Sequence, residues 1–171
     1  MNATALKSAA IERAEMDPGI RVRIAESRDQ DFVMSLVPRL VASGLPSWRD
    51  PRKMLAAYSE VIGSVLHTQR SGAVLLIAED EHAVPLGFIL LVAATDCYTH
   101  ERHGHVAQIV VVDPQDVAAG LALIDAAENW ARSRGYRLLM MSEFWANHPA
   151  RAICQQLGFV EEAVSYRKAV R

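Results

Sequence analysis

The amino-acid sequence predicts a single α/β domain, and three observations support this fold class. The chain has 171 residues, a length that fits one domain with its own core. Between residues 73 and 112 it carries three mostly apolar runs, which are typical of strands covered on both faces. Segments with helical periodicity stand before and after these runs. This alternation is that of a mixed α/β domain.

The composition excludes several classes of protein. Hydrophobic residues make up 51% and charged residues 22%, which indicates a globular chain rather than a disordered one. The net charge of −2 argues against a nucleic-acid or anionic-membrane partner. No apolar run has the length of a membrane span, and no secretory signal is evident. Cys97 and Cys154 form neither a disulfide framework nor a metal-ligand spacing, so we expect reduced thiols in a cytoplasmic protein.

The N-terminal part divides into an extension and the start of the domain. Residues 1–19 are expected to be an extension, with a short helix over 5–15, and residues 20–171 the domain. Polar and apolar side chains alternate over 21–25, which predicts a half-buried strand.

Two helices are expected next. Ser27 and Gln30 have the spacing of a capping box, which predicts a helix that Pro38 bends and Gly44 ends. Its apolar stripe consists of Phe32, Val33, Leu36, Val37, Leu40 and Val41. Asp50-Pro51 is a helix start, and this second helix should end within 69–72. Its stripe consists of Met54, Leu55, Tyr58, Val61, Ile62, Val65 and Leu66.

The remaining elements follow the same logic of periodicity and turn residues. The three apolar runs predict strands at 73–79, 84–95 and 105–112, separated by a turn at 80–83 and a loop at 96–104. Beyond them we expect a helix at 118–134 capped by Gly135, a strand at 137–142, a helix from Pro149 to Gly158, and strands at 159–160 and 164–170.

Several motifs resemble the GNAT superfamily of N-acetyltransferases. The resemblance covers residues 21–170 and is closest over 105–159. The motifs are Leu86-Gly87-Phe88, Asp113-Pro114, the helix end 126–136, Asn147-His148-Pro149-Ala150-Arg151-Ala152, Leu157-Gly158-Phe159 and Ser165-Tyr166-Arg167-Lys168. It implies a mixed, mostly antiparallel central sheet with helices on both faces and a splay between the fourth and fifth strands. It also implies an acyl-CoA cofactor, and it makes a homodimer an open expectation.

The resemblance implies a cofactor site at this splay and at the following helix N-terminus, whose free N–H groups suit a pyrophosphate. The matching loop is Gln115–Gly120, in which Ala118 replaces the usual first glycine and Asp116 adds a negative charge. By itself this stretch indicates the start of an Ala-rich helix, and it is the flanking motifs that favour a phosphate-binding loop. The implied cofactor-binding residues are Val110, Val111, Val112, Gln115, Asp116, Val117, Ala118, Ala119, Gly120, Leu121, Asn147 and Ala150.

Three residues are candidates for catalysis. Gln108 stands where the family often has an acidic base, and it cannot act as one. Cys154 stands where the family has a proton-donating tyrosine, although a buried apolar cysteine is the simpler interpretation. His105, which follows His100 and His103, is a candidate base at neutral pH. We expect no metal, because no acidic or cysteine pattern completes a site around these histidines.

The resemblance also places the acceptor pocket between the loop 45–48 and the turn 161–165. Trp48 is a candidate for stacking on a ligand or for packing, and Glu161 for attracting a cationic amine or for a solvated turn. Gln108 is the third candidate for contact with the acceptor.

These features predict an N-acetyltransferase. It would move an acetyl group, or another short acyl group, from its CoA thioester to a primary amine of a small molecule by direct attack in a ternary complex. Three usual features are altered: the loop glycine, the carboxylate and the tyrosine. A non-catalytic acyl-CoA-binding or protein-interaction module is therefore the alternative. A protein N-terminus or an aminoacyl-tRNA as acceptor is a third hypothesis, and the negative net charge counts against the tRNA.

Overall fold

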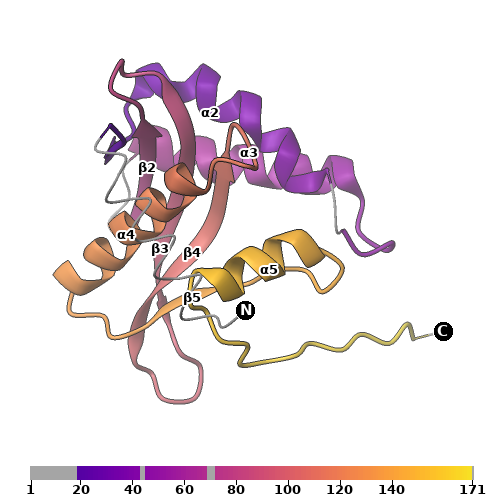
Figure 1. Ribbon diagram of the computed structural model, residues 1–171. Coiled ribbons are helices and arrows are strands. Elements are labelled where there is room, and N and C mark those ends of the chain that lie inside the picture. Colours follow the sequence, from indigo (N-terminus) through magenta and orange to yellow (C-terminus); the bar gives the residue numbers. More distant parts are fainter. Residues whose placement is uncertain (1–18, 43–44, 69–71, 171) are drawn as a thin grey trace.

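A computed structural model describes residues 19–42, 45–68 and 72–170 of the chain (Figure 1). The helix expected at 5–15 and the helix end expected at Gly44 lie outside the described residues.

The described residues form one five-stranded sheet with the strands in sequence order. The strands are β1 (Arg21–Ile24), β2 (Ala73–Glu79), β3 (Pro85–Thr95), β4 (Arg102–Val111) and β5 (Leu139–Met141). Neighbours from β1 to β4 pair antiparallel, whereas β5 pairs parallel to β4. The expected mixed, mostly antiparallel sheet is confirmed.

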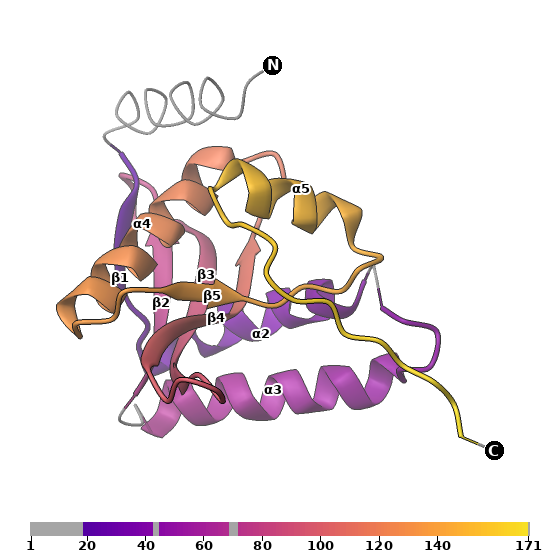
Figure 2. The ribbon, with the colours of Figure 1, turned by 90° about the horizontal axis from the view of Figure 1, so that it is seen from below.

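Helices cover both faces of the sheet, as expected (Figure 2). They are η1 (Ser27–Asp29), α2 (Gln30–Leu36), η2 (Val37–Val41), α3 (Pro51–Thr68), α4 (Val117–Ser133) and α5 (His148–Gln156). The helices α2 and α3 lie on one face and α4 on the other. Successive side chains of β3 alternate between the two faces, so Phe88 and Leu90 join the core under α2 and α3, while Ile89 and Leu91 join the core under α4.

One predicted helix cap is found in the structure, and another differs from the prediction. Asp50 caps α3 as expected, with its carboxylate accepting a hydrogen bond from the N–H of Arg52 at 2.8 Å. The capping box expected from Ser27 and Gln30 is wrong by one residue. The N–H of Glu26 instead donates to Asp29 at 2.7 Å, because Asp29 is held in place by an arginine on β1.

Proline and glycine disturb or follow the helices at the predicted positions. At Pro38 the helix narrows to the 3-10 helix η2, which is the expected disturbance. The helices α4 and α5 are followed by Gly135 (φ 73°) and Gly158 (φ 87°), both in the left-handed region that favours glycine.

The strand boundaries needed correction at three places. Residues 102–104 belong to β4 rather than to a loop, because they pair with β3. The fifth strand is shorter than the expected 137–142. The strands expected at 159–160 and 164–170 are wrong, since no strand pairing and no backbone hydrogen bond involves residues 160–170 in the described structure. Alternating side chains favour a strand, but a strand forms only with a partner.

Candidate functional site

The strands β4 and β5 separate after a short stretch of pairing. Only Gly104, His105 and Val106 of β4 pair with β5, whereas β4 continues along β3 to Val111. Within the described residues, the stretch 107–111 therefore has no strand partner on its β5 side. The splay expected between the fourth and fifth strands is confirmed.

A β-bulge sits at the start of this splay. Leu90 pairs with Gln108 but Leu91 pairs with Val106, so Ala107 is the extra residue of β4. Ala107 and Val110 pack against the core under α2 and α3. Since Gln108 precedes Val110 by two residues, it lies on the same face. Its side-chain Oε1 is buried without a hydrogen-bond partner in the described structure, which is an unusual state for an amide.

The backbone of β4 directs some of its N–H groups into the splay. The N–H of Val112 donates to the carbonyl of Leu86 on β3 at 2.7 Å. Because alternate residues point to alternate edges, Val110 also faces β3, whereas Ile109 and Val111 present their N–H groups to the splay. Of the three valines expected here, Val111 is thus the one whose amide faces the gap. Ile109 was missed by sequence reasoning.

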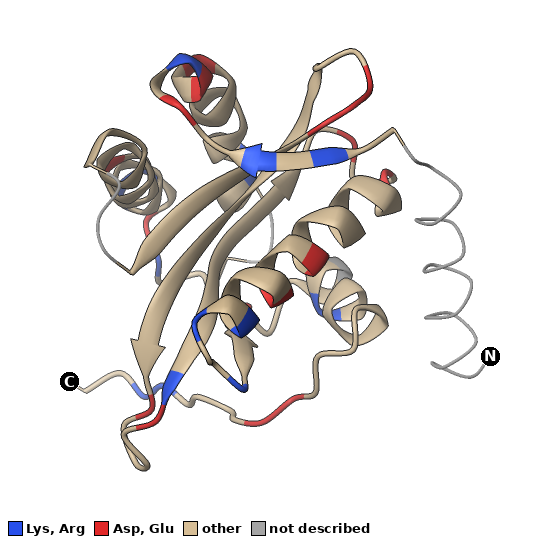
Figure 3. Ribbon diagram, turned by 90° about the vertical axis from the view of Figure 1, so that its left-hand side faces the viewer, with Lys and Arg blue, Asp and Glu red and all other residues tan. Residues whose placement is uncertain are grey.

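The N-terminus of α4 is partly occupied by the chain itself. Asp116 is the N-cap, and its carboxylate accepts a hydrogen bond from the N–H of Ala119 at 3.0 Å. The N–H of Val117 donates to the carbonyl of Gln115. A Cβ built on Gly120 would meet no atom within 4 Å, so this side of the helix start is open to a ligand. The acidic residues Asp125 and Glu128 precede the first basic residue of α4, Arg132 (Figure 3).

Arg39 brings a positive charge to this end of β4. It lies in η2, and its Nη1 donates to the carbonyl oxygen of Val111 at 3.1 Å and to that of Val112. These carbonyls directly precede the loop that leads into α4, so the guanidinium ties η2 to this end of β4. The sequence carried no signal for this contact, because Arg39 is 72 residues from Val111 and belongs to another element.

The helix α5 follows β5 on the other side of the splay. Asn147 directly precedes α5, and Cys154 lies within it. The side chain of Asn147 caps the helix by accepting from the N–H of Ala150 at 3.5 Å. Burial, and then the nearby charge of Glu143, raise the pKa of the half-buried Cys154 thiol. The thiol is therefore protonated at neutral pH.

Glu143 is the acidic residue that sequence reasoning missed. Its charge raises the pKa of Cys154 and, after burial as the larger cause, that of Tyr58 on α3. Its charge therefore acts on a group of α3 and on a group of α5. The signal in the sequence was its position two residues after β5, because groups at the carboxyl end of a strand are well placed to meet a ligand.

His105 lies just before the splay. It pairs with Met140 of β5, and it is on the same face of β4 as Ala107. Burial, followed by the charge of His103, lowers the pKa of its half-buried imidazole, which is therefore neutral at pH 7. No group of three or more metal-ligating side chains is found around these histidines or elsewhere in the part of the chain that is described.

The two remaining acceptor candidates have partners of their own. The guanidinium carbons of Arg49 and Arg167 lie 4.4 and 4.1 Å from the centre of the Trp48 ring. Glu161 forms an ion pair with Arg151. Trp48 is nevertheless half exposed, so one part of it is accessible to a ligand.

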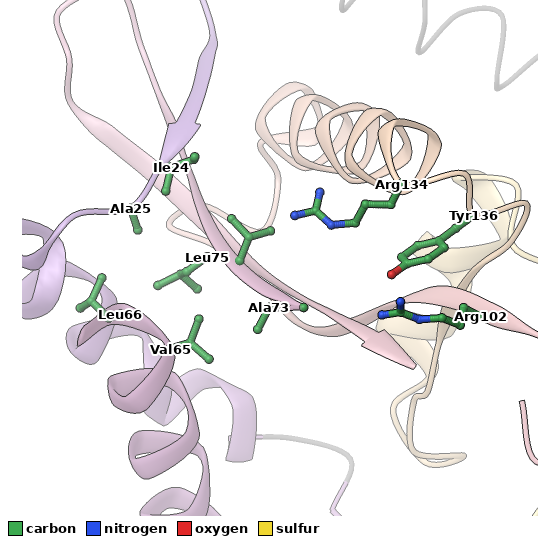
Figure 4. A pocket seen from close by; sticks show the side chains of 11 residues that line it. Ile24, Ala25, Val65, Leu66, Ala73, Leu75, Arg102, Arg134 and Tyr136 are labelled. Carbon is green, nitrogen blue, oxygen red and sulfur yellow. The ribbon is translucent and has the colours of Figure 1, made fainter. Parts of the chain in front are cut away.

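One surface cavity lies apart from these residues. It measures about 440 Å³ and lies where β4 begins, whereas the splay lies where β4 ends (Figure 4). Arg102, Arg134 and Tyr136 line it together with apolar side chains of β2 and α3. None of the expected site residues contributes to it.

A family model of the acetyltransferase (GNAT) family matches residues 38–159, more than half of the chain. The chain belongs to the GNAT family of acetyltransferases. A comparison with curated proteins gave no match. Within the described residues, no helix is long and apolar enough to span a membrane.

Solved structures of GNAT proteins share the fold. A putative acetyl transferase from Pyrococcus furiosus is 18% identical, with a TM-score of 0.69, over 88% of this chain and 99% of that one. The protein AAC(6')-Iy, solved with the bisubstrate analogue CoA-S-monomethyl-acetylneamine, is 20% identical with a TM-score of 0.62 over 88% of this chain and 99% of that one. A ribosomal-protein-alanine N-acetyltransferase from Brucella melitensis biovar Abortus 2308 is 18% identical with a TM-score of 0.62 over 89% and 99%. At these identities the likeness establishes the fold alone.

Proposed function

We propose that the protein is an acetyl-CoA-dependent N-acetyltransferase that acts on a primary amine of a small molecule. The observation that carries this proposal is the splay between β4 and β5, into which the N–H groups of Ile109 and Val111 point without a strand partner. Bound acetyl-CoA, or another short acyl-CoA, would supply a thioester carbonyl for attack by the amine. The residues around the splay would bind the two substrates, orient them and transfer the protons.

The residues at the splay fit such a cofactor in part. The N–H groups of Ile109 and Val111 suit an amide-bearing arm and a carbonyl oxygen that gains charge. Gln115, Asp116, Val117, Ala118, Ala119, Gly120 and Leu121 surround the α4 N-terminus, where a pyrophosphate would lie. Asp116 opposes this anion, while Arg39 and the open side of Gly120 favour it. Asn147 and Ala150, at the start of α5, would contact the cofactor from the other side of the splay.

The acceptor would approach from the α3 side, past Trp48 and Gln108. Glu143 would attract its cationic amine, and the neutral imidazole of His105 would accept the proton that the amine loses. Cys154, whose thiol is protonated, would be the donor to the leaving thiolate. One structural neighbour was solved with a CoA analogue of acetylneamine and another is named for a ribosomal-protein alanine, and the negative net charge favours a cationic small molecule. A cytoplasmic location is part of the same proposal.

One observation favours the non-catalytic alternative. The carboxylate of Asp116 already accepts from the N–H of Ala119, which removes one donor from the pyrophosphate and adds repulsion. A charge at a helix terminus is typically worth about 0.3–1 kcal/mol, which weakens the binding of an anion without abolishing it.

Thermal unfolding with acetyl-CoA and with free CoA tests the cofactor site. Saturating ligand should raise the melting temperature, because a ligand that binds the folded state alone stabilises it. Arg39→Ala should reduce this rise, and Arg52→Ala, which removes an exposed arginine at the start of α3, should not. If neither acetyl-CoA nor free CoA changes the melting temperature of the wild-type protein, the enzyme proposal is refuted.

A panel of amines, with thiol release as the readout, tests the acceptor side. Glu143→Gln should raise the KM of a cationic amine by about threefold to fivefold with little change in kcat, since exposed charge pairs contribute up to about 1 kcal/mol. Glu128→Gln on the far face is the control. His105→Ala should lower kcat by about 10²-fold as a lost base. Rates that are unchanged in both His105→Ala and Cys154→Ala would remove the proposed base and acid.

A further inference from the structure

The cavity of about 440 Å³ where β4 begins has the character of a binding site of its own (Figure 4). We call it the basic cavity. Its volume lies within the range of about 300–1,000 Å³ that is usual for small-molecule sites. Among the described residues, its polar side chains are those of Arg102, Arg134 and Tyr136, and no Asp or Glu lines it. The residues proposed to hold acetyl-CoA and the amine lie elsewhere, so the cavity has no part in the proposed reaction.

Aromatic rings hold the two arginines of the basic cavity in place. The guanidinium carbon of Arg134 lies 4.5 Å from the centre of the Trp130 ring, and that of Arg102 lies 5.5 Å from the centre of the Tyr136 ring. The two rings contact each other edge to face, with their centres 5.9 Å apart. A guanidinium that lies over a ring still directs its N–H groups outward, where an anion can accept from them. This arrangement fixes two donors on one wall before a ligand arrives, which lowers the entropy cost of binding.

The positive charges of this wall are not neutralised within the described structure. Neither Arg102 nor Arg134 forms an ion pair with a described residue. By contrast, Arg132 at the same end of α4 pairs with Glu128. Two guanidinium groups that line one cavity without a carboxylate partner attract an anion.

The backbone of β2 adds a further donor to the basic cavity. The strand β1 ends at Ile24, and the N–H of Ala25 donates to the carbonyl of Leu75 at 2.8 Å. Because alternate residues of a strand face alternate edges, Ala73 directs its N–H and its carbonyl to the same side as Leu75. No described strand pairs with Ala73 on that side. Since Ala73 lines the cavity, its N–H is available to a ligand there.

The opposite wall of the basic cavity is apolar. Figure 4 shows side chains of β1, β2 and α3 across from the two arginines. Val65, Leu66 and Leu75 are buried, whereas Ile24 is 57% exposed. A ligand with an apolar body would cover Ile24 and remove this side chain from water, which is favourable by about 25 cal/mol for each Å² covered.

We propose that the basic cavity binds a small organic carboxylate with an apolar body, of the kind that a medium-chain fatty acid represents. The carboxylate would accept from Arg102, Arg134 and the N–H of Ala73, and the apolar body would lie along Ile24 and Leu75. A sugar phosphate or a nucleotide fits less well, because it would place polar groups against the apolar wall. The site does not depend on acetyl transfer, so its test is separate from that of the proposed function.

Isothermal titration calorimetry with octanoate tests the chemistry of the ligand. Octanoate should bind to the wild-type protein in the millimolar range or more tightly, with one molecule for each chain. From butanoate to hexanoate to octanoate, each added methylene should tighten binding by about threefold to fourfold, because each is transferred from water to the apolar wall. Acetate, which lacks the apolar body, and octyltrimethylammonium, which has the opposite charge, should not bind. Equal binding of octanoate and octyltrimethylammonium, or no binding of octanoate in the millimolar range, would overturn the proposal.

Substitutions in the cavity test the location. Arg102→Gln and Arg134→Gln should each weaken the binding of octanoate by about threefold to tenfold, since each removes a charged donor. Ile24→Asp should weaken it as well, and because Ile24 is exposed this variant should fold. Arg132→Gln, at the same end of α4 but outside the cavity, is the matched control and should bind octanoate like the wild type.

Saturating CoA separates this site from the splay. Octanoate should bind with the same affinity in the presence of CoA, because the two ligands would occupy different places. Displacement of octanoate by CoA would assign the fatty acid to the splay and overturn the proposal. Binding that is unchanged in both Arg102→Gln and Arg134→Gln would also overturn it.

Discussion

Arg23 on β1 holds together two buried carboxylates from different parts of the chain. Its two terminal nitrogens donate to Asp29 at 2.7 and 2.8 Å, and its Nε donates to Glu79 at 2.7 Å. Glu79 is 2% exposed and Asp29 5% exposed. Arg21, which is largely exposed, donates to the second oxygen of Glu79. The hydrogen bonds from Arg23 are the largest cause of the lowered pKa of both carboxyl groups.

Arg23→Met should therefore destabilise the fold strongly. It leaves Asp29 without its bidentate partner and Glu79 with Arg21 alone, and breaking a buried pair from one side costs about 3–5 kcal/mol. Arg21→Met is the matched control, and because Arg21 is exposed its loss should cost about 1 kcal/mol or less. Urea unfolding of both variants measures the two losses. Equal losses would show that Arg23 holds no special place in this network.

At the scale of single residues, the candidate site was predicted in part. Gln108, His105 and Asn147 follow from a strand and a helix start that the sequence predicts well. Glu143 and Arg39 do not, because their roles depend on contacts with elements far away in the chain. Local spacing does not encode such contacts.

At the scale of elements, Gly87 explains how β3 and β4 fit together beside the splay. A Cβ at Gly87 would lie 2.5 Å from the carbonyl oxygen of Val110 and 2.9 Å from the Cα of Val111. These are backbone atoms, which cannot move aside without distorting β4. The glycine of the Leu86-Gly87-Phe88 motif is thus required for close packing of β3 against β4. It lies next to the amides that face the splay.

Two glycine-to-alanine substitutions should have opposite effects on stability. Gly87→Ala should destabilise the fold by about 1–3 kcal/mol through overpacking. Gly120→Ala should stabilise it by about 0.5–1 kcal/mol, because it lies in α4 with open space around its Cβ. It should also reduce the thermal shift with acetyl-CoA. Urea unfolding measures the stabilities, and a Gly87→Ala protein as stable as the wild type would contradict the packing argument.

The last strands show where reasoning about elements failed. Residues 164–170 alternate as a strand should, yet the described structure gives them no neighbouring strand. Helices α3 and α4 were predicted to within a residue or two, because a helix completes its hydrogen bonds within its own segment. A strand forms only when it pairs with a second strand, and its own sequence does not indicate whether such a partner is present.

At the scale of the whole molecule, one sheet separates two cores. The core under α2 and α3 and the core under α4 share β2, β3 and β4, whose side chains alternate between them. The buried ion pairs of Arg23 lie where β1 meets β2, at the edge of this sandwich. The stability of the domain therefore depends on the charge state of a few groups.

The stability of the protein should fall with decreasing pH over two separate ranges. The pKa of His105 is lowered by burial, so the unfolded chain takes up its proton first, and stability should fall as the pH drops below the ordinary value of 6.5. The lowered pKa values of Glu79 and Asp29 stabilise the fold above their ordinary values of 4.5 and 3.8. That stabilisation should be lost as the pH falls through the lower folded values. Urea midpoints measured against pH test this, and the fall over the lower range should be shallower in Arg23→Met.

The sequence by itself determined the class of fold, the positions of the helices and the GNAT family, through periodicity and motifs that act over short distances. The three apolar runs at 73–112 required a sheet covered on both sides, and the structure has one. The tertiary structure decided what depends on distant partners: the buried amide oxygen of Gln108 without a partner, the effect of Glu143 on Tyr58 and Cys154, Arg39 at the end of β4, and residues 160–170 without a strand partner. The physical reason is that a helix or a turn is completed locally, whereas a strand edge, a buried charge and a site each need groups from elsewhere in the chain.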